Sequence, residues 1–187
     1  MTAREIQVQD DSREVMISTH CGLTHVPDSR SNVNTPDAYD ENGNPYELKS
    51  ATRNSVTTAR DVGLATIQSW REKYWIVAKG RNLRKGFEIE CLYIAHPRQL
   101  EPFFGRIETR LQEDWSECEQ VLNGAKQAGV NPSIITKVEA MLQRGITLNN
   151  PHIPMRLIEQ TTPLDPKNSD RARQQLIEFV TANPLDG

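Results

Sequence analysis

Apolar residues recur three and four positions apart in the middle of the chain, which is the spacing of helices that bury one face. The stretch 60–73 shows this period at Val62, Leu64, Ala65, Ile67 and Trp70. A long helical segment starts near Pro102, because proline is favoured in the first turn of a helix. Its apolar stripe consists of Phe103, Ile107, Leu111, Trp115, Cys118 and Leu122. Gly129 and Asn131-Pro132 interrupt the pattern, and a second helix is predicted at 132–144. The stripe is most simply core, with a dimer interface or an arm that clasps a binding partner as the alternatives.

The N-terminal third begins with a polar segment that has no clear period. Residues 1–11 are expected to be loosely ordered. Ser12 can cap a helix that runs to about Cys21, and Gly22 is its predicted stop. The stretch 23–34 contains Pro, Asp and Ser and is expected to be a loop.

The C-terminal part alternates in the same way between regular segments and breaks. A strand is predicted from Ile153 to Gln160, and the two prolines of 161–167 predict a loop after it. Ser169 can cap a final helix at 170–181. The residues of this helix expected to face inward are Ala172, Leu176, Ile177 and Val180.

The strand signals lie between these helices. Residues 37–49 form a predicted hairpin, because Asn42-Gly43 is a strong signal for a two-residue turn. Two further strands are predicted at about 74–79 and 86–94, joined by a basic turn. The order hairpin, helix, strand, strand predicts an α/β fold with a central mixed β-sheet flanked by helices. We expect one domain over residues 1–187, with 102–144 as an added helical segment.

Composition is that of an ordinary globular protein. Charged residues make up 25% of the 187 residues and hydrophobic residues 36%, and the formal net charge is −3. The chain has no apolar run near the roughly 18 residues that cross a membrane, and its N-terminus has no apolar signal core. The three cysteines form no CxxC pair, so a structural zinc site is not expected. We expect them to be free thiols in a reducing cytoplasm.

The candidate chemistry lies in the hairpin. Glu47 and Lys49 are two apart on one strand and therefore point to the same face, and the turn brings Asp37 back beside them. Two carboxylates form an oxygen site that suits Mg²⁺. Such an ion would polarise a phosphoryl oxygen and lower the pKa of a bound water. Lys49 could orient that water or offset charge on a phosphate. The pattern Asp, then Glu-x-Lys, is typical of PD-(D/E)xK nucleases, although Glu-x-Lys alone is common on exposed strands.

The letters around this pattern make the prediction more specific. The segment PDAYDENGNPYELKS resembles the active-site hairpin of the PvuII-like type II restriction endonucleases, and the segments 74–78 and 88–93 resemble their next two core strands. The segment 148–154 resembles their late Asn-Asn-Pro motif, which reaches into the major groove. The resemblance implies a restriction-endonuclease fold with Asp37, Glu47 and Lys49 as catalytic residues, and with Asp37 and Glu47 as ligands of Mg²⁺.

The same resemblance implies which residues contact DNA. The candidates are Asn149, Asn150, Arg60, Thr58, Arg53 and His152. An Asn amide can pair with adenine and an Arg guanidinium with guanine in the major groove. Two adjacent asparagines before a proline are also a common turn, because Asn tolerates a left-handed backbone.

The function that we expect is Mg²⁺-dependent, sequence-specific cleavage of double-stranded DNA by a homodimer, since twofold symmetry matches a palindromic site. Two alternatives remain at this point. One is a nuclease selective for DNA structure, for repair or junction cutting, and the other is a DNA-binding protein with a vestigial metal site. The net charge does not decide between them, because a cleft can be locally basic on an acidic protein.

Overall fold

The computed structural model describes residues 3–27, 35–84 and 86–185, so most of the predicted loop at 23–34 lies outside the described residues. At the centre is a six-stranded sheet in the order β1-β2-β3-β5-β6-β8. Its strands are β1 (Thr24–His25), β2 (Ala38–Tyr39), β3 (Pro45–Ala51), β5 (Tyr74–Asn82), β6 (Phe87–Ala95) and β8 (Thr162–Leu164). Strands β3 and β5 are parallel and the other neighbours are antiparallel. The predicted mixed α/β sheet is therefore confirmed.

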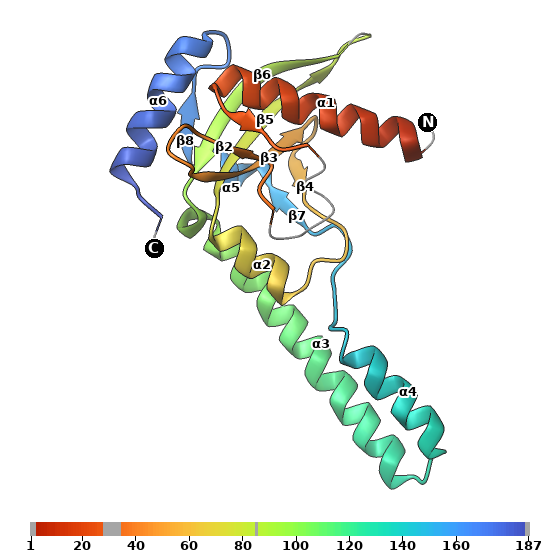
Figure 1. Cartoon of the computed structure of the whole chain (residues 1–187). Coiled ribbons are helices and arrows are strands. Elements are labelled where there is room, and N and C mark those ends of the chain that lie inside the picture. Colours follow the sequence, from red (N-terminus) through yellow and green to blue (C-terminus); the bar gives the residue numbers. More distant parts are fainter. Residues whose placement is uncertain (1–2, 28–34, 85, 186–187) are drawn as a thin grey trace.

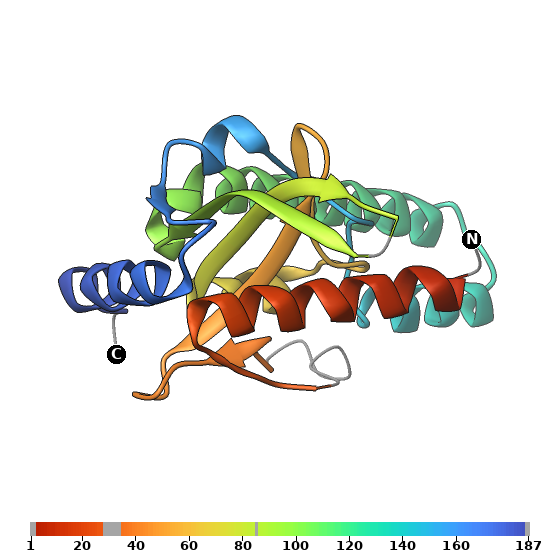
Figure 2. The same cartoon turned by 90° about the horizontal axis from the view of Figure 1, so that it is seen from above.

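Helices cover both faces of this sheet (Figure 1, Figure 2). Helices α1 (Ala3–Cys21) and α6 (Ser169–Ala182) lie on one face, and α2 (Leu64–Arg71), α3 (Glu101–Gln127) and α5 (Met155–Ile158) lie on the other. Buried residues on the first face include Ile17, Tyr46, Leu48, Ile76 and Leu176. Buried residues on the second include Ile67, Trp75, Val77, Phe104 and Met155. Successive residues of a strand point to opposite faces, so each central strand contributes to both cores.

A second, two-stranded sheet lies beside the first and consists of β4 (Ser55–Thr57) and β7 (His152–Pro154). Its register pairs Val56 with Ile153 and Thr57 with His152. An additional bridge joins Val62 to Leu148, with hydrogen bonds of 2.9 and 2.8 Å between their backbone groups. The segments 55–62 and 148–154 therefore form one unit, although about ninety residues of sequence separate them.

The segment 102–144 forms a helical arm that projects away from the sheet (Figure 1). It consists of most of α3 and of α4 (Pro132–Leu142), which pack against each other. Of the predicted stripe, Phe103, Ile107 and Leu111 are buried, but Trp115 is 36% exposed. The prediction of a core stripe holds only for the sheet-proximal turns, because the distal turns of α3 have only α4 to cover them.

Two predicted boundaries of helices are wrong. Helix α1 begins at Ala3 and not at Ser12, since residues 3–21 contain neither Gly nor Pro to break it. It does end at Cys21, and the Gly22 that follows has a φ of 70°, the left-handed conformation that glycine accepts after a helix. The cap of α6 is Asn168, whose Oδ1 accepts from the backbone N–H of Arg171 at 3.0 Å, and not Ser169.

The predictions for 153–167 are also wrong in detail. The strand β7 ends at Pro154, and the short helix α5 follows it. The predicted loop contains β8, which pairs with β6 at the edge of the sheet and places Pro163 opposite Tyr93. An edge strand tolerates proline because one side of its backbone needs no ladder partner. On α6, Ile177 is exposed rather than inward.

Candidate active site

The hairpin of β2 and β3 brings Asp37 opposite Glu47. The backbone N–H of Asp37 donates to the carbonyl of Tyr46 at 2.9 Å, and Ala38 pairs with Tyr46 in the antiparallel register. The connection is longer than the predicted two-residue turn, because Tyr39 pairs with Pro45 and five residues lie between them.

The side chain of Asp40 organises this longer loop. Its Oδ1 accepts from the backbone N–H groups of Asn42 and Asn44, both at 2.9 Å. Its Oδ2 accepts from the hydroxyl of Tyr46 at 3.0 Å. Of the Asn42-Gly43 pair only Gly43 has a positive φ, at 82°. An aspartate that binds backbone N–H groups ahead of it makes the tight two-residue turn unnecessary.

The parallel strand β5 lies against the other side of β3. Glu47 pairs with Trp75, and Lys49 pairs with Val77. Glu47 and Lys49 therefore point toward the core that α2 and α3 cover, while Leu48 between them points toward α1. Asp37 and Glu47 are both buried, so these two carboxylates lie under the surface of the protein.

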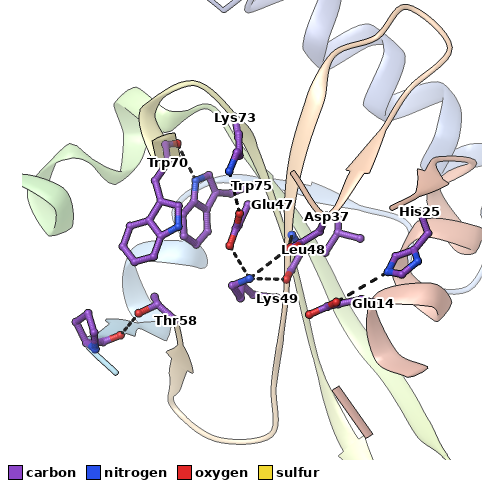
Figure 3. A network of polar contacts seen from close by, with 11 residues as sticks. Glu14, His25, Asp37, Glu47, Leu48, Lys49, Thr58, Trp70, Lys73 and Trp75 are labelled. Atoms are coloured by element: carbon purple, nitrogen blue, oxygen red, sulfur yellow. Dashed lines mark hydrogen bonds and ion pairs between the residues drawn. The ribbon is translucent and has the colours of Figure 1, made fainter. Parts of the chain in front are cut away.

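Three oxygen atoms converge on the ammonium of Lys49 (Figure 3). The Nζ atom is 2.6 Å from Oε1 of Glu47 and 3.3 Å from Oδ2 of Asp37, and it donates to the carbonyl of Leu48 at 3.0 Å. The backbone N–H of Leu48 donates to Oδ2 of Asp37 at 2.9 Å, which holds the carboxylate in this orientation. The structure thus brings together the three residues that the sequence singled out, and their catalytic roles remain predictions.

Burial and neighbouring charges act on these groups in different directions. Burial raises the pKa of Glu47, and the charge of Asp37 adds to this rise, while Lys49 and Lys73 oppose it. Burial alone would lower the pKa of Lys49, but the carboxylates of Asp37 and Glu47 outweigh burial and raise that pKa well above its ordinary value. The two carboxylates therefore favour the charged form of Lys49.

The oxygen atoms of this site fit a hard divalent cation. Among the described residues no group of three or more His, Cys, Asp and Glu side chains could hold a metal ion by itself. The donors here are two carboxylates and one backbone carbonyl, and Mg²⁺ usually accepts one or two carboxylates and completes its shell with waters and phosphate oxygens. Asp37, Glu47 and the carbonyl of Leu48 could hold such an ion if the ammonium group of Lys49 moved away from part of the space that it now fills.

Sequence reasoning missed two participants in this site. One is the carbonyl of Leu48, which no side-chain pattern reports. The other is Lys73, which is buried with its Nζ atom 3.7 Å from Oε2 of Glu47. The signal available in the sequence was a lysine directly before an apolar strand, two positions from Trp75 and so on the same face.

The six predicted DNA contacts lie in the 55–62 and 148–154 unit or next to it. Arg53 is exposed in the turn before β4, and Arg60 is exposed after it. The hydroxyl of Thr58 donates to the carbonyl of Pro151 at 2.6 Å, so this side chain holds the two segments together. His152 is exposed, with Nδ1 3.5 Å from the hydroxyl of Thr57.

The two asparagines differ in their surroundings. Asn150 is half-buried and has a φ of 48°, a left-handed conformation that asparagine tolerates better than most residues. Asn149 is exposed. The left-handed backbone therefore explains an asparagine at position 150, whereas it does not explain the asparagine at position 149.

More than half of the chain matches a known protein family. The model of the family described as "Restriction endonuclease PvuII" matches residues 5–129, which extend from α1 to the end of α3 and include Asp37, Glu47 and Lys49. The chain belongs to the PvuII restriction endonuclease family. A search of curated proteins gives no match.

Membership of the PvuII family establishes the reaction in general terms. This protein is a type II restriction endonuclease, and its substrate is DNA. Enzymes of this kind are typically metal-dependent, in agreement with the oxygen donors of the hairpin. The match ends before Asn149, Asn150 and His152, so the role of those residues depends on the local motif alone. Within the described ranges, every helix is too short or too polar to span a membrane.

Proposed function

We propose that this PvuII-family enzyme cleaves double-stranded DNA with Mg²⁺, using Asp37 and Glu47 as metal ligands and Lys49 as the positioned cation of the site. The observation that carries the proposal is the convergence of three oxygen atoms on one ammonium group within 3.3 Å. A cation is already stabilised at this place by the protein, and a divalent ion needs the same donors.

When bound, Mg²⁺ supplies Lewis-acid polarisation of a phosphoryl oxygen and acidifies water beside it. The chain supplies the rest. The hydrogen bond from the backbone N–H of Leu48 orients the carboxylate of Asp37. The contact with Lys73 orients the carboxylate of Glu47. Lys49 would lie beside the phosphate, where its charge would offset the negative charge that develops during hydrolysis.

DNA contact is proposed for the unit of 55–62 and 148–154. Asn149 is the better candidate for a base contact because it is exposed, whereas Asn150 and Thr58 shape the loop that presents it. Arg60 is exposed and could pair with guanine in the major groove. Arg53 and His152 are exposed as well and suit contacts with phosphates, which fix the register of the protein on DNA.

The enzyme is proposed to act as a twofold homodimer on a palindromic sequence. One site of this kind cuts one strand, so double-strand cleavage requires two sites or a reorientation. Twofold symmetry of the protein matches twofold symmetry of the DNA.

The test is digestion of a sequenced genomic DNA with Mg²⁺, followed by sequencing of the fragment ends. Discrete fragments with one common end sequence support the proposal. Cutting confined to branched DNA, or binding without cutting, would contradict it. Asp37→Asn and Glu47→Gln should each abolish cleavage, while Glu108→Gln serves as the matched control. Glu108 pairs with Arg71 at 2.8 Å on the flank of α3, far along the chain from the hairpin.

A further inference from the structure

A second lysine belongs to the buried charge cluster of the hairpin. Lys73 lies between α2 and β5, and only 3% of its surface is exposed. Its Nζ atom is 3.7 Å from Oε2 of Glu47, whereas Lys49 contacts the other oxygen, Oε1, at 2.6 Å. Figure 3 shows the two lysines reaching the carboxylate of Glu47 from opposite sides.

The position of Lys73 is fixed by its neighbours. The rings of Trp70 and Trp75 pack edge to face with centroids 5.3 Å apart, and the indole N–H of Trp75 donates to the carbonyl of Trp70 at 3.2 Å. These contacts hold together the two ends of the turn from α2 into β5, in which Lys73 lies. Lysine is almost never fully buried unless it is paired with an opposite charge. Burial also keeps Lys73 away from DNA, so any effect on the reaction passes through Glu47.

The formal charges of the four side chains that contact one another balance, and the carboxylate of Glu14 acts on Lys49 as a further, weaker negative charge. Asp37 and Glu47 contribute two negative charges, and Lys49 and Lys73 contribute two positive charges. A divalent cation that enters this cluster alone adds two positive charges to a buried group that already holds two ammonium ions. Such an excess is unfavourable at low dielectric, and the negative phosphate of DNA reduces it. Without Lys73 the cluster would be more negative by one charge and would attract the cation more strongly.

We propose that Lys73 is a positioning residue of this site that weakens binding of a divalent cation to the DNA-free protein and so couples metal binding to DNA binding. The inference rests on the proposed metal ligands Asp37 and Glu47. Coupling of this kind is reciprocal, because a phosphate that improves metal affinity is itself bound more tightly when the metal is present. It would favour assembly of the complete centre on DNA.

The experiment measures binding of Ca²⁺ alone to the DNA-free protein by isothermal titration calorimetry. Ca²⁺ has the charge of Mg²⁺ and also takes oxygen ligands. Lys73→Met removes the charge and keeps most of the volume, and we expect it to bind Ca²⁺ about tenfold more tightly than the wild type, which is about 1.4 kcal/mol. Lys73→Arg keeps the charge and should bind like the wild type. Lys73→Gln replaces Lys73→Met if the latter does not fold.

Two controls make the result specific. Lys79→Met removes a lysine of β5 whose Nζ atom is 2.9 Å from Oε1 of Glu159, and it should leave Ca²⁺ affinity unchanged. Asp37→Asn should weaken Ca²⁺ binding strongly. Unchanged or weaker binding in both neutral Lys73 variants, or tighter binding in Lys73→Arg, would overturn the inference. If Asp37→Asn also bound Ca²⁺ like the wild type, the proposed metal site itself would be wrong.

Discussion

Replacing Lys49 by methionine tests whether its ammonium holds the place of a cation in the hairpin. The substitution removes the group that lies within 3.3 Å of Asp37 and Glu47 and leaves two buried carboxylates close together. Side-chain exposure is 14% for Lys49 and 9% for each carboxylate, so water screens these charges little. Methionine has a similar length but offers neither charge nor a hydrogen-bond donor.

The expected loss of stability follows from this burial. Removing one partner of a buried ion pair costs about 3–5 kcal/mol, because the other charge remains in place without compensation. Lys73 still neutralises part of the charge of Glu47, so we expect the lower end, about 3 kcal/mol. For a chain of this size, that loss lowers the melting temperature by about 6–12 °C.

A divalent cation should restore the stability that the substitution removes, because it supplies positive charge to the two carboxylates. Ca²⁺ at about one hundred times its dissociation constant stabilises a folded protein by about 2.7 kcal/mol, nearly the expected loss. The assay is thermal unfolding followed by circular dichroism, for wild type and Lys49→Met, in EDTA and over a series of Ca²⁺ concentrations. The difference in melting temperature should be large in EDTA and should shrink as Ca²⁺ is added.

The control is Lys126→Met on the arm. Lys126 pairs with Glu139 at 2.7 Å, but the two side chains are 44% and 38% exposed. Exposed ion pairs contribute about 0–1 kcal/mol, so this variant should melt close to the wild type and respond to Ca²⁺ as the wild type does. An unchanged melting temperature of Lys49→Met in EDTA, or a deficit that Ca²⁺ does not reduce, would refute the argument.

Three other predictions concern DNA reading, the arm and assembly. Asn149→Ala should reduce discrimination between the cognate site and single-base variants by about 1–3 kcal/mol. Asn150→Gly keeps the left-handed backbone and should cleave DNA nearly as the wild type does. Cleavage rates on a panel of DNA sites with single-base substitutions measure both effects. Leu111→Ala should lower the free energy of unfolding by about 2–5 kcal/mol because Leu111 is 3% exposed, and Val121→Ala, at a position 74% exposed, should change it by less than about 0.5 kcal/mol in urea unfolding. Light scattering should give the mass of a dimer on DNA, and a monomer both free and on DNA would point to sequential nicking.

The sequence by itself determined the features that depend on short-range periodicity. Glu47 and Lys49 share a face because residues two apart on a strand do so in any sheet. A hairpin between residues 37 and 49 then needs only a chain reversal, which Asp40 and Gly43 provide. The resemblance to the family was visible for a similar reason, since the active-site segment that carries it, residues 36–50, is continuous in the sequence.

Only the tertiary structure decided which distant groups complete the site. Lys73 meets Glu47 because β5 pairs in parallel with β3, and that register follows from the packing of two cores against the sheet. The bridge between Val62 and Leu148 holds the loop of Asn149 beside Thr58, and no local sequence pattern predicts this pairing. The periodicity of α3 is uniform, but its burial stops after Leu111 because the sheet ends there. Periodicity reports which side of an element is apolar, whereas burial and charge pairing depend on what the rest of the chain brings to that side.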